Sequence, residues 1–291
     1  MTAAYWDSTR RLIMAFSSGK PIPHPVETLC HRPWELAVKP FQVSPRTWYV
    51  SGQKWVGAYL IDTGEGLILI DTGIAESLYL MLDSIYRLGY RMENIKKILL
   101  SHAHLDHFGG AASLHALTGA PLYMSREDAE FMKNCPAETE LPHDLWHVQH
   151  IHVDRYYDEF NPVCLGDIAV RTILTPGHTP GCTSFFWEEK NPETGDIYTV
   201  AMHGGVGANT MNDDYYKKSA FLTPDLRDRF IADAEKMKAI HVDIALPSHP
   251  NQIEILDRAG TYTHLTQPYL DNSVWPDFID ERVRQVKALM K

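Results

Sequence analysis

The sequence of 291 residues is short of several features that would point to particular classes of protein. It contains no apolar stretch of about 20 residues, the length that a helix needs to cross a bilayer. Its four cysteines include no Cys-x-x-Cys pair, which predicts buried thiols in a reducing compartment. Lys and Arg number 27 against 37 Asp and Glu, for a net charge of −10. This acidic balance argues against general nucleic-acid binding and against an anionic membrane surface.

The N-terminus carries little that resembles a secretory signal. Arg10-Arg11 precede an apolar segment, residues 12–16, that is too short for one. We therefore expect a cytoplasmic protein, or a periplasmic or secreted one if a leader has been removed from this sequence. A hydrophobic content of 44% allows a large core. The length allows one α/β domain as well as two.

A cluster of potential metal ligands is the most informative feature that is present. The run His102-Ala103-His104-Leu105-Asp106-His107 follows the apolar residues 98–100, which predict a buried strand. Neutral imidazoles are good zinc ligands, and the carboxylate adds a harder oxygen. Because side chains along this run alternate in direction, the first two histidines can point one way while the aspartate and the third histidine point another. The spacing therefore predicts two neighbouring metals, with a solvated histidine-rich turn as the alternative.

Two further histidines follow predicted strands. His178 stands in the loop 175–181, where prolines and glycines on both sides predict a rigid turn. His249 follows the apolar run 242–246. Either residue alone is typical of an ordinary loop, but their repeated placement after strands indicates additional ligands.

These stretches resemble the metallo-β-lactamase superfamily of hydrolases, and within it the third subclass of true β-lactamases. The resemblance covers the chain from about Trp48 to the C-terminal helix. The His-x-His-x-Asp-His motif is typical of the superfamily as a whole, whereas the loop 175–184 is more specific to the subclass. The stretches that carry the likeness are Thr47-Trp48-Tyr49-Val50, Leu69-Ile70-Asp71-Thr72-Gly73, 101–110, 175–184 and 247–252.

The resemblance implies two Zn²⁺ ions per chain and assigns residues to each. One ion would be held by His102, His104 and His178, and the other by Asp106, His107 and His249. Asp106 would also act in catalysis by positioning the hydroxide.

Two further residues, Asp71 and Thr179, are expected to orient ligands. The alternative for Asp71 is a turn residue that caps the loop after Ile70.

The expected fold is an α/β architecture of the αββα type. Two mixed sheets would pack face to face with helices outside. We expect an N-terminal arm at 1–46 and a single metallo-β-lactamase-fold domain at 47–291, with an insertion at about 134–160. The insertion contains four histidines, for which a polar loop is favoured over another metal site. They are His143, His147, His150 and His152.

The resemblance implies hydrolysis without a serine or cysteine nucleophile. Two zinc ions roughly 3.5–4 Å apart lower the pKa of a shared water toward about 7 and so supply hydroxide. Lactonases and thioesterases of the superfamily place a bridging aspartate after the strand equivalent to 198–202, where this chain has His203-Gly204-Gly205-Val206-Gly207. We therefore expect opening of cyclic amides, β-lactam antibiotics first. The alternative is another ester, lactone or thioester. The subclass commonly has serines near Gly205 and Gly207, and their absence weakens the β-lactam assignment.

Substrate recognition is expected on the segment 203–218. Its glycines let the backbone approach a ligand, and several side chains offer donors or a positive charge. The candidates are His203, Asn209, Tyr215, Lys217 and Lys218. A mobile surface loop is the alternative.

The expected partner is a small-molecule substrate, with neither nucleic acid nor membrane, and no oligomeric state is implied. Two rival classes are weaker. A purely structural zinc site is usually rich in cysteine, and a nuclease of the same superfamily disagrees with the acidic balance.

Overall fold

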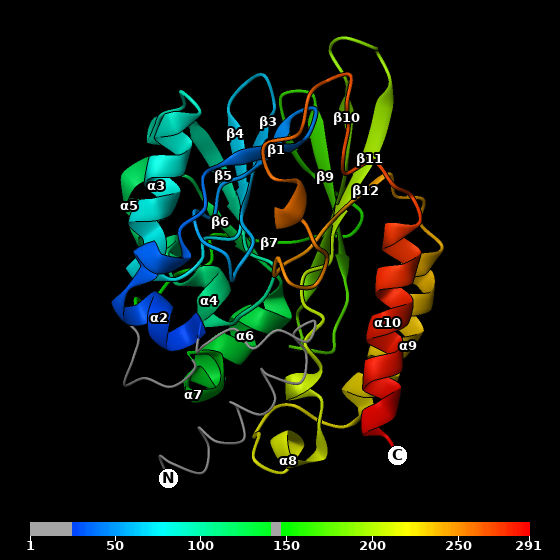
Figure 1. Cartoon of the computed structure of the whole chain (residues 1–291). Helices are drawn as coiled ribbons and strands as arrows, with labels where there is room; N and C mark the ends of the chain where they lie inside the picture. Colours follow the sequence, from blue (N-terminus) through cyan, green and yellow to red (C-terminus); the bar gives the residue numbers. More distant parts are fainter. Residues whose placement is uncertain (1–24, 141–146) are drawn as a thin grey trace.

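Figure 1 shows the computed structural model, which describes residues 25–140 and 147–291. Two β-sheets lie face to face, and helices cover the outer side of each (Figure 1). The predicted αββα class is therefore confirmed.

The first sheet contains seven strands in sequence order within the described residues. Its first four strands are antiparallel, and the pairs from β4 to β7 are parallel. The strands are β1 (Phe41–Ser44), β2 (Thr47–Tyr49), β3 (Tyr59–Asp62), β4 (Leu67–Ile70), β5 (Ile95–Leu99), β6 (Leu122–Met124) and β7 (Arg155–Tyr156).

The second sheet has five strands, in the order β12-β11-β10-β9-β8. Only its β11–β12 pair is parallel, so both sheets are mixed. The strands are β8 (Val163–Leu165), β9 (Ile168–Leu174), β10 (Thr183–Lys190), β11 (Ile197–Met202) and β12 (Ile244–Leu246).

Alternation along the strands explains why the sheets are covered on both faces. In β4, Ile68 and Ile70 belong to the core between the sheets, whereas Leu67 and Leu69 belong to the core beneath the helices. All four side chains are buried, which suits a strand between two apolar layers better than one with a solvated face.

The helices complete the outer layers. In Figure 1, α3 and α5 cover the first sheet, and α9 and α10 cover the second. The helices are α2 (Pro25–His31), α3 (Leu78–Arg87), α4 (Leu105–Phe108), α5 (Ala111–Thr118), α6 (Arg126–Asn134), α7 (Pro136–Thr139), α8 (Asp213–Tyr216), α9 (Asp225–Lys238) and α10 (Val274–Leu289). Short 3-10 helices are η1 (Pro33–Leu36), η2 (Ala75–Ser77), η3 (Met92–Asn94), η4 (Ala208–Thr210) and η5 (Leu256–Arg258).

Two segments bear on the expected arm and insertion. Strand β1 lies inside the range 1–46 and pairs with β2, so the sheet begins before residue 47. Residues 1–24 of that arm lie outside the described part of the chain. In the range 134–160, α7 and β7 are regular, residues 147–154 are not, and His143 lies among the undescribed residues 141–146.

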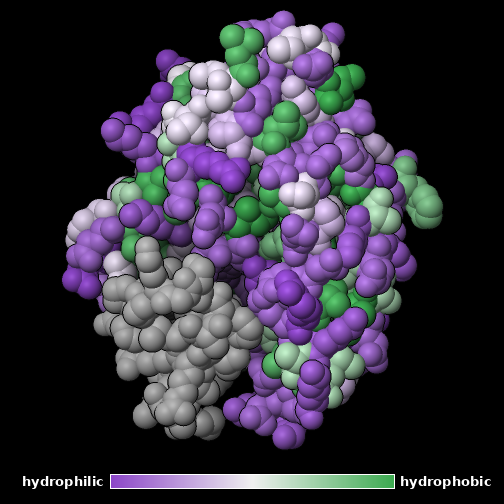
Figure 2. All heavy atoms as spheres, turned by 45° about the vertical axis from the view of Figure 1, so that its right-hand side comes forward, coloured by the Kyte–Doolittle hydropathy of each residue, from purple (hydrophilic) through white to green (hydrophobic). Residues whose placement is uncertain are grey.

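The surface is mainly hydrophilic on the face that Figure 2 draws, and hydrophobic residues appear there in small separate groups. In the part of the chain that the structure describes, no helix is both long and apolar enough for a membrane span. The prediction of buried thiols is confirmed for Cys135 and Cys182 but is wrong for Cys164, which is exposed, and Cys30 is only half-buried.

Candidate metal centre

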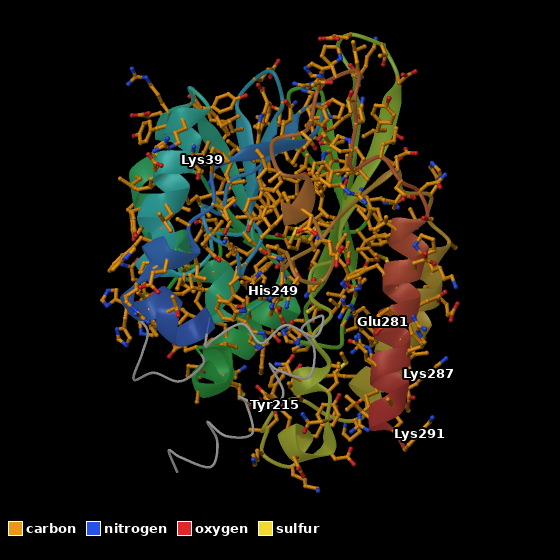
Figure 3. All side chains as sticks on the ribbon, in the orientation of Figure 1. Lys39, Tyr215, His249, Glu281, Lys287 and Lys291 are labelled. Atoms are coloured by element: carbon orange, nitrogen blue, oxygen red, sulfur yellow. The ribbon has the colours of Figure 1, made fainter. Side chains whose placement is uncertain are left out.

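Loops at the ends of three strands carry the candidate ligands. His102 to His107 follow β5 and run into the single turn α4. His178 follows β9, and His249 follows β12. In Figure 3 the labelled His249 lies at the lower end of the two sheets, beside α4. Segments far apart in sequence therefore meet at one end of the fold.

Two groups of side chains have ligand atoms within 4.8 Å of one another. The first consists of His102, His104 and His178, as the resemblance implied; within it, His104 Nδ1 lies 2.9 Å from His178 Nε2. The second consists of His102, Asp106 and His107. Of the residues described, these two groups include one carboxylate, that of Asp106.

His249 lies beside two members of the second group. Its Nε2 atom lies 3.2 Å from His107 Nε2 and 3.5 Å from Asp106 Oδ2. The structure thus brings together all six residues that the resemblance implied as ligands. His102 lies between the groups, because its ring centroid is 5.0 Å from that of His104 and 4.0 Å from that of His107.

Hydrogen bonds at Nδ1 fix the orientation of three of the imidazole rings. His178 Nδ1 donates to the Gly207 carbonyl at 2.8 Å, and His249 Nδ1 donates to the Trp55 carbonyl at 2.7 Å. His107 Nδ1 lies 2.7 Å from Asp71 Oδ2. A donor at Nδ1 leaves the lone pair on Nε2, so these bonds set the tautomer that a metal needs.

The donor set fits a metal. His102 Nε2 and His104 Nε2 are buried and have no hydrogen-bond partner among the described residues. An unpartnered buried nitrogen costs free energy unless something binds it. An ion on His102 Nε2 would remove that cost, and imidazole with carboxylate suits a divalent transition metal.

Electrostatics favour the same protonation state. Burial lowers the pKa of His178 and of His249 to about 4, and it lowers the pKa of His102 and His104 well below the usual range. These rings are therefore neutral near pH 7, which is the form that binds metals. For His107, burial opposes the charge but the carboxylates of Asp106 and Asp71 outweigh it, so its pKa is raised.

The glycines that follow β11 pack directly on His178. A Cβ atom on Gly207 would lie 2.7 Å from His178 Cε1, and one on Gly205 would lie 2.5 Å from Cys182 Sγ. Both distances are too short for real contacts, so this backbone leaves no room for serine at either position.

The predicted substrate residues are scattered by comparison. His203 is 1% exposed and packs among aromatic rings, 6.1 Å from Phe230 and 6.3 Å from Trp275 between ring centroids. Burial lowers its pKa to about 3. These observations give no support to a role for His203 in substrate contact.

The other four candidates lie nearer the surface. Asn209, Lys217 and Lys218 are exposed, and Lys217 Nζ lies 3.2 Å from Asp214 Oδ1. Tyr215 is half-buried, belongs to α8 and lies below His249 in Figure 3. Their part in recognition stays a prediction.

Sequence reasoning missed several groups that orient the ligands. Trp55 and Gly207 act through their backbone carbonyls, and because every residue has one, the residue type gives no indication of this role. Thr210 donates its hydroxyl to the His178 carbonyl at 2.7 Å, and Ser101 Oγ lies 3.0 Å from His102 Nδ1. Among these residues, Ser101 could have been suspected from the sequence, because it directly precedes the histidine motif.

Curated relatives align with part of the chain. It is 24% identical over 169 residues to a probable metallo-hydrolase, YybB, of Bacillus subtilis, which covers 58% of this chain and 68% of that protein. It is 32% identical over 116 residues to the hydroxyacylglutathione hydrolase GloC of Haemophilus influenzae, covering 39% and 53%. It is 29% identical over 163 residues to an N-acyl homoserine lactonase of Bacillus thuringiensis, covering 46% and 58%. The chain thus spans between half and about two thirds of these relatives.

A solved structure matches almost end to end. The subclass B3 metallo-beta-lactamase BJP-1 of Bradyrhizobium japonicum superposes with a TM-score of 0.75 at 27% identity, over 89% of this chain and 99% of that one. The model of the Metallo-beta-lactamase superfamily matches residues 56–191, which include five of the six candidate ligands. The family model over residues 56–191, the fold and the ligand cluster all match the metallo-β-lactamase superfamily of hydrolases.

Proposed function

We propose that this chain is a di-zinc hydrolase that opens cyclic amides, with β-lactams as its first substrate class. The observation that carries the proposal is the composition of the donor set. Five histidines and Asp106 converge, and no second carboxylate joins the two groups within the described residues. The segment 203–207, which would supply a bridging aspartate in the lactonases and thioesterases, has none.

The chain's own residues would prepare the site for this chemistry. His102, His104 and His178 would hold one ion, and Asp106, His107 and His249 the other. When bound, the two ions supply a Lewis acid for the carbonyl oxygen and a water of lowered pKa. Asp106 would keep a free carboxylate oxygen for hydrogen bonding, and Asp71 and Thr179 would hold the ligand loops in place.

A second substrate class has its own support. The curated relatives include a lactonase and a hydroxyacylglutathione hydrolase, whose substrates are an ester and a thioester. Gly205 and Gly207 offer no side chain for a substrate carboxylate, and a lactone needs none there. We therefore keep a lactone or thioester as the alternative to the β-lactam.

A substrate screen tests the two possibilities. The zinc-loaded protein would be assayed with penicillins, cephalosporins, carbapenems, N-acyl homoserine lactones and glutathione thioesters. We expect β-lactam opening that a chelator abolishes and that clavulanate-type inhibitors leave unchanged, since such inhibitors need a nucleophilic serine. Hydrolysis of a lactone or thioester with no action on any β-lactam would refute the proposed substrate.

A further inference from the structure

Asp128 is a buried carboxylate that the site has not yet accounted for. It lies in the first turn of α6 and is 0% exposed. Its hydrogen bonds reach into two ligand loops that are far from it in sequence. Oδ2 accepts from the Ala103 N–H at 2.8 Å and from the Thr179 hydroxyl at 2.7 Å, while Oδ1 accepts from the Gly181 N–H at 2.7 Å.

These three donors flank the candidate ligands. Ala103 stands between His102 and His104, and Thr179 follows His178 directly. One carboxylate therefore connects the loop after β5 to the loop after β9. Those loops carry the whole first ligand group, so their relative position decides the geometry of that group.

Helix capping alone does not explain the arrangement. Ser125 caps α6 through its hydroxyl, which accepts from the Asp128 N–H at 3.1 Å. In a capping box the acidic side chain at this position turns back to the N–H of the cap residue. Here the described hydrogen bonds of the carboxylate go instead to the two ligand loops.

Close packing at Gly181 points the same way. A Cβ atom on Gly181 would lie 2.1 Å from Ser125 Oγ and 2.4 Å from the Asp128 nitrogen. The loop after β9 is thus pressed against the start of α6, with no space for a side chain between them. Burial raises the pKa of Asp128 to about 7, and the hydrogen bonds from Thr179, Ala103 and Gly181 oppose that rise because they favour the charged form.

We propose that Asp128 is a positioning residue, which fixes the two loops that hold His102, His104 and His178 and so sets the affinity of that metal position. The inference relies on the proposed function only for the identity of these ligands. It requires no particular substrate.

Metal binding tests the inference without any assay of hydrolysis. Asp128→Asn replaces one acceptor oxygen by an N–H donor, so at least one of the three bonds becomes a contact between two donors. Thr179→Val removes the bond to Asp128 together with the hydroxyl's contact to Cys182 Sγ at 3.0 Å, and Thr179→Ser keeps the hydroxyl. For each variant one would measure the Zn²⁺ dissociation constant by chelator competition, the Co²⁺ absorption spectrum, and the melting temperature without metal.

Glu189 provides a matched control. It is a second buried carboxylate with several donors, including Ser44 Oγ at 2.8 Å and Trp187 Nε1 at 2.6 Å. It lies near the end of β10 that is farther in sequence from the ligand loop. Glu189→Gln should lower the melting temperature and leave the affinity for Zn²⁺ and the Co²⁺ spectrum unchanged.

We expect Asp128→Asn to weaken Zn²⁺ binding by about 10–100-fold and to alter the Co²⁺ spectrum, as loss of an outer partner usually does. Thr179→Val should shift both in the same direction by less, and Thr179→Ser should restore them. If Asp128→Asn does not fold, the Thr179 pair decides. Wild-type binding in Asp128→Asn or Thr179→Val, or equal weakening in Glu189→Gln, would overturn the inference. A protein that binds zinc normally but opens no β-lactam would refute only the proposed substrate.

Discussion

The carboxylate of Asp71 contacts the Nδ1 side of the His107 ring, with 2.7 Å between Asp71 Oδ2 and His107 Nδ1, and both side chains are fully buried. Asp71 also accepts from the N–H and the hydroxyl of Ser101, each at 2.7 Å. Its φ of 60° is in the left-handed region, which non-glycine residues seldom adopt. A strained backbone at this position is consistent with a residue fixed for its contacts.

Asp71→Asn should therefore weaken zinc binding by about 10–100-fold. The amide offers only one acceptor oxygen to the three donors, and its NH₂ would face a donor. Chelator competition gives the dissociation constant. Asp62→Asn is the control, since Asp62 bonds to Tyr90 and Gly64 rather than to a candidate ligand. Unchanged affinity in Asp71→Asn would remove Asp71 from the metal centre.

Gly207→Ala should disturb His178 in a different way. The new methyl group would meet the ring at 2.7 Å from Cε1, and the carbonyl that accepts from Nδ1 would have to move with the backbone. We expect a loss of zinc affinity of about tenfold or more. The fall should be visible in the metal content after dialysis.

Gly119→Ala is the matched control for that experiment. A Cβ there meets nothing within 4 Å, although the φ of 67° makes alanine strained. It should cost about 1 kcal/mol of stability and leave metal binding intact. If both variants lose zinc equally, the loss is caused by lower stability of the fold and not by the changed packing on His178.

Much of the candidate site could be predicted because its ligands stand in short sequence patterns that can be recognised without the structure. Four of the six lie within the run 102–107, and the other two follow strands that apolar residues make visible. The apolar run 67–70 predicts a strand, and β4 is found there. The run 56–61 predicts a strand that starts at Val56, but β3 begins at Tyr59, because the N–H of Val56 bonds to Gln53 Oε1 instead of a neighbouring strand.

What the sequence did not reveal depends on distant contacts. Ser125 with Asp128 three residues later is a sequence pattern typical of a helix start, and α6 does begin there. Thr179, to which Asp128 bonds, is however 51 positions away. No period or spacing connects the two. His203 was read as a donor because of its type, whereas its surroundings come from α9 and α10 packing over β11.

The burial of His203 has a consequence for stability in acid. Burial, with a smaller contribution from Arg282, lowers its pKa from 6.5 to about 3. Below pH 6.5 His203 binds a proton in the unfolded chain but stays neutral in the folded chain. The contribution of His203 to stability therefore falls as the pH drops from about 6.5 toward 3. At pH 5 this loss would be about 2 kcal/mol.

His203→Gln should flatten that dependence. Glutamine is polar but does not titrate, so the difference in unfolding free energy between pH 7.5 and pH 5 should shrink by about 2 kcal/mol. Denaturant unfolding of the metal-free proteins at both pH values gives the comparison. An equally steep loss in the variant would mean that His203 is protonated in the folded protein. A raised KM with unchanged kcat would instead favour the predicted contact with substrate.

The last prediction concerns the number of metals. Protein purified without chelator should carry about two equivalents of zinc, and zinc should raise its melting temperature, because ligands that bind only the folded state stabilise it. His104→Ala should lower the content toward about one equivalent, since it removes one member of the first ligand group. His241→Ala is the control: its ring is exposed and bonds to Asp243, away from the six candidate ligands. One equivalent or less in the wild type, unchanged by added zinc, would contradict the two-metal site, and equal losses in both variants would indicate surface-bound zinc.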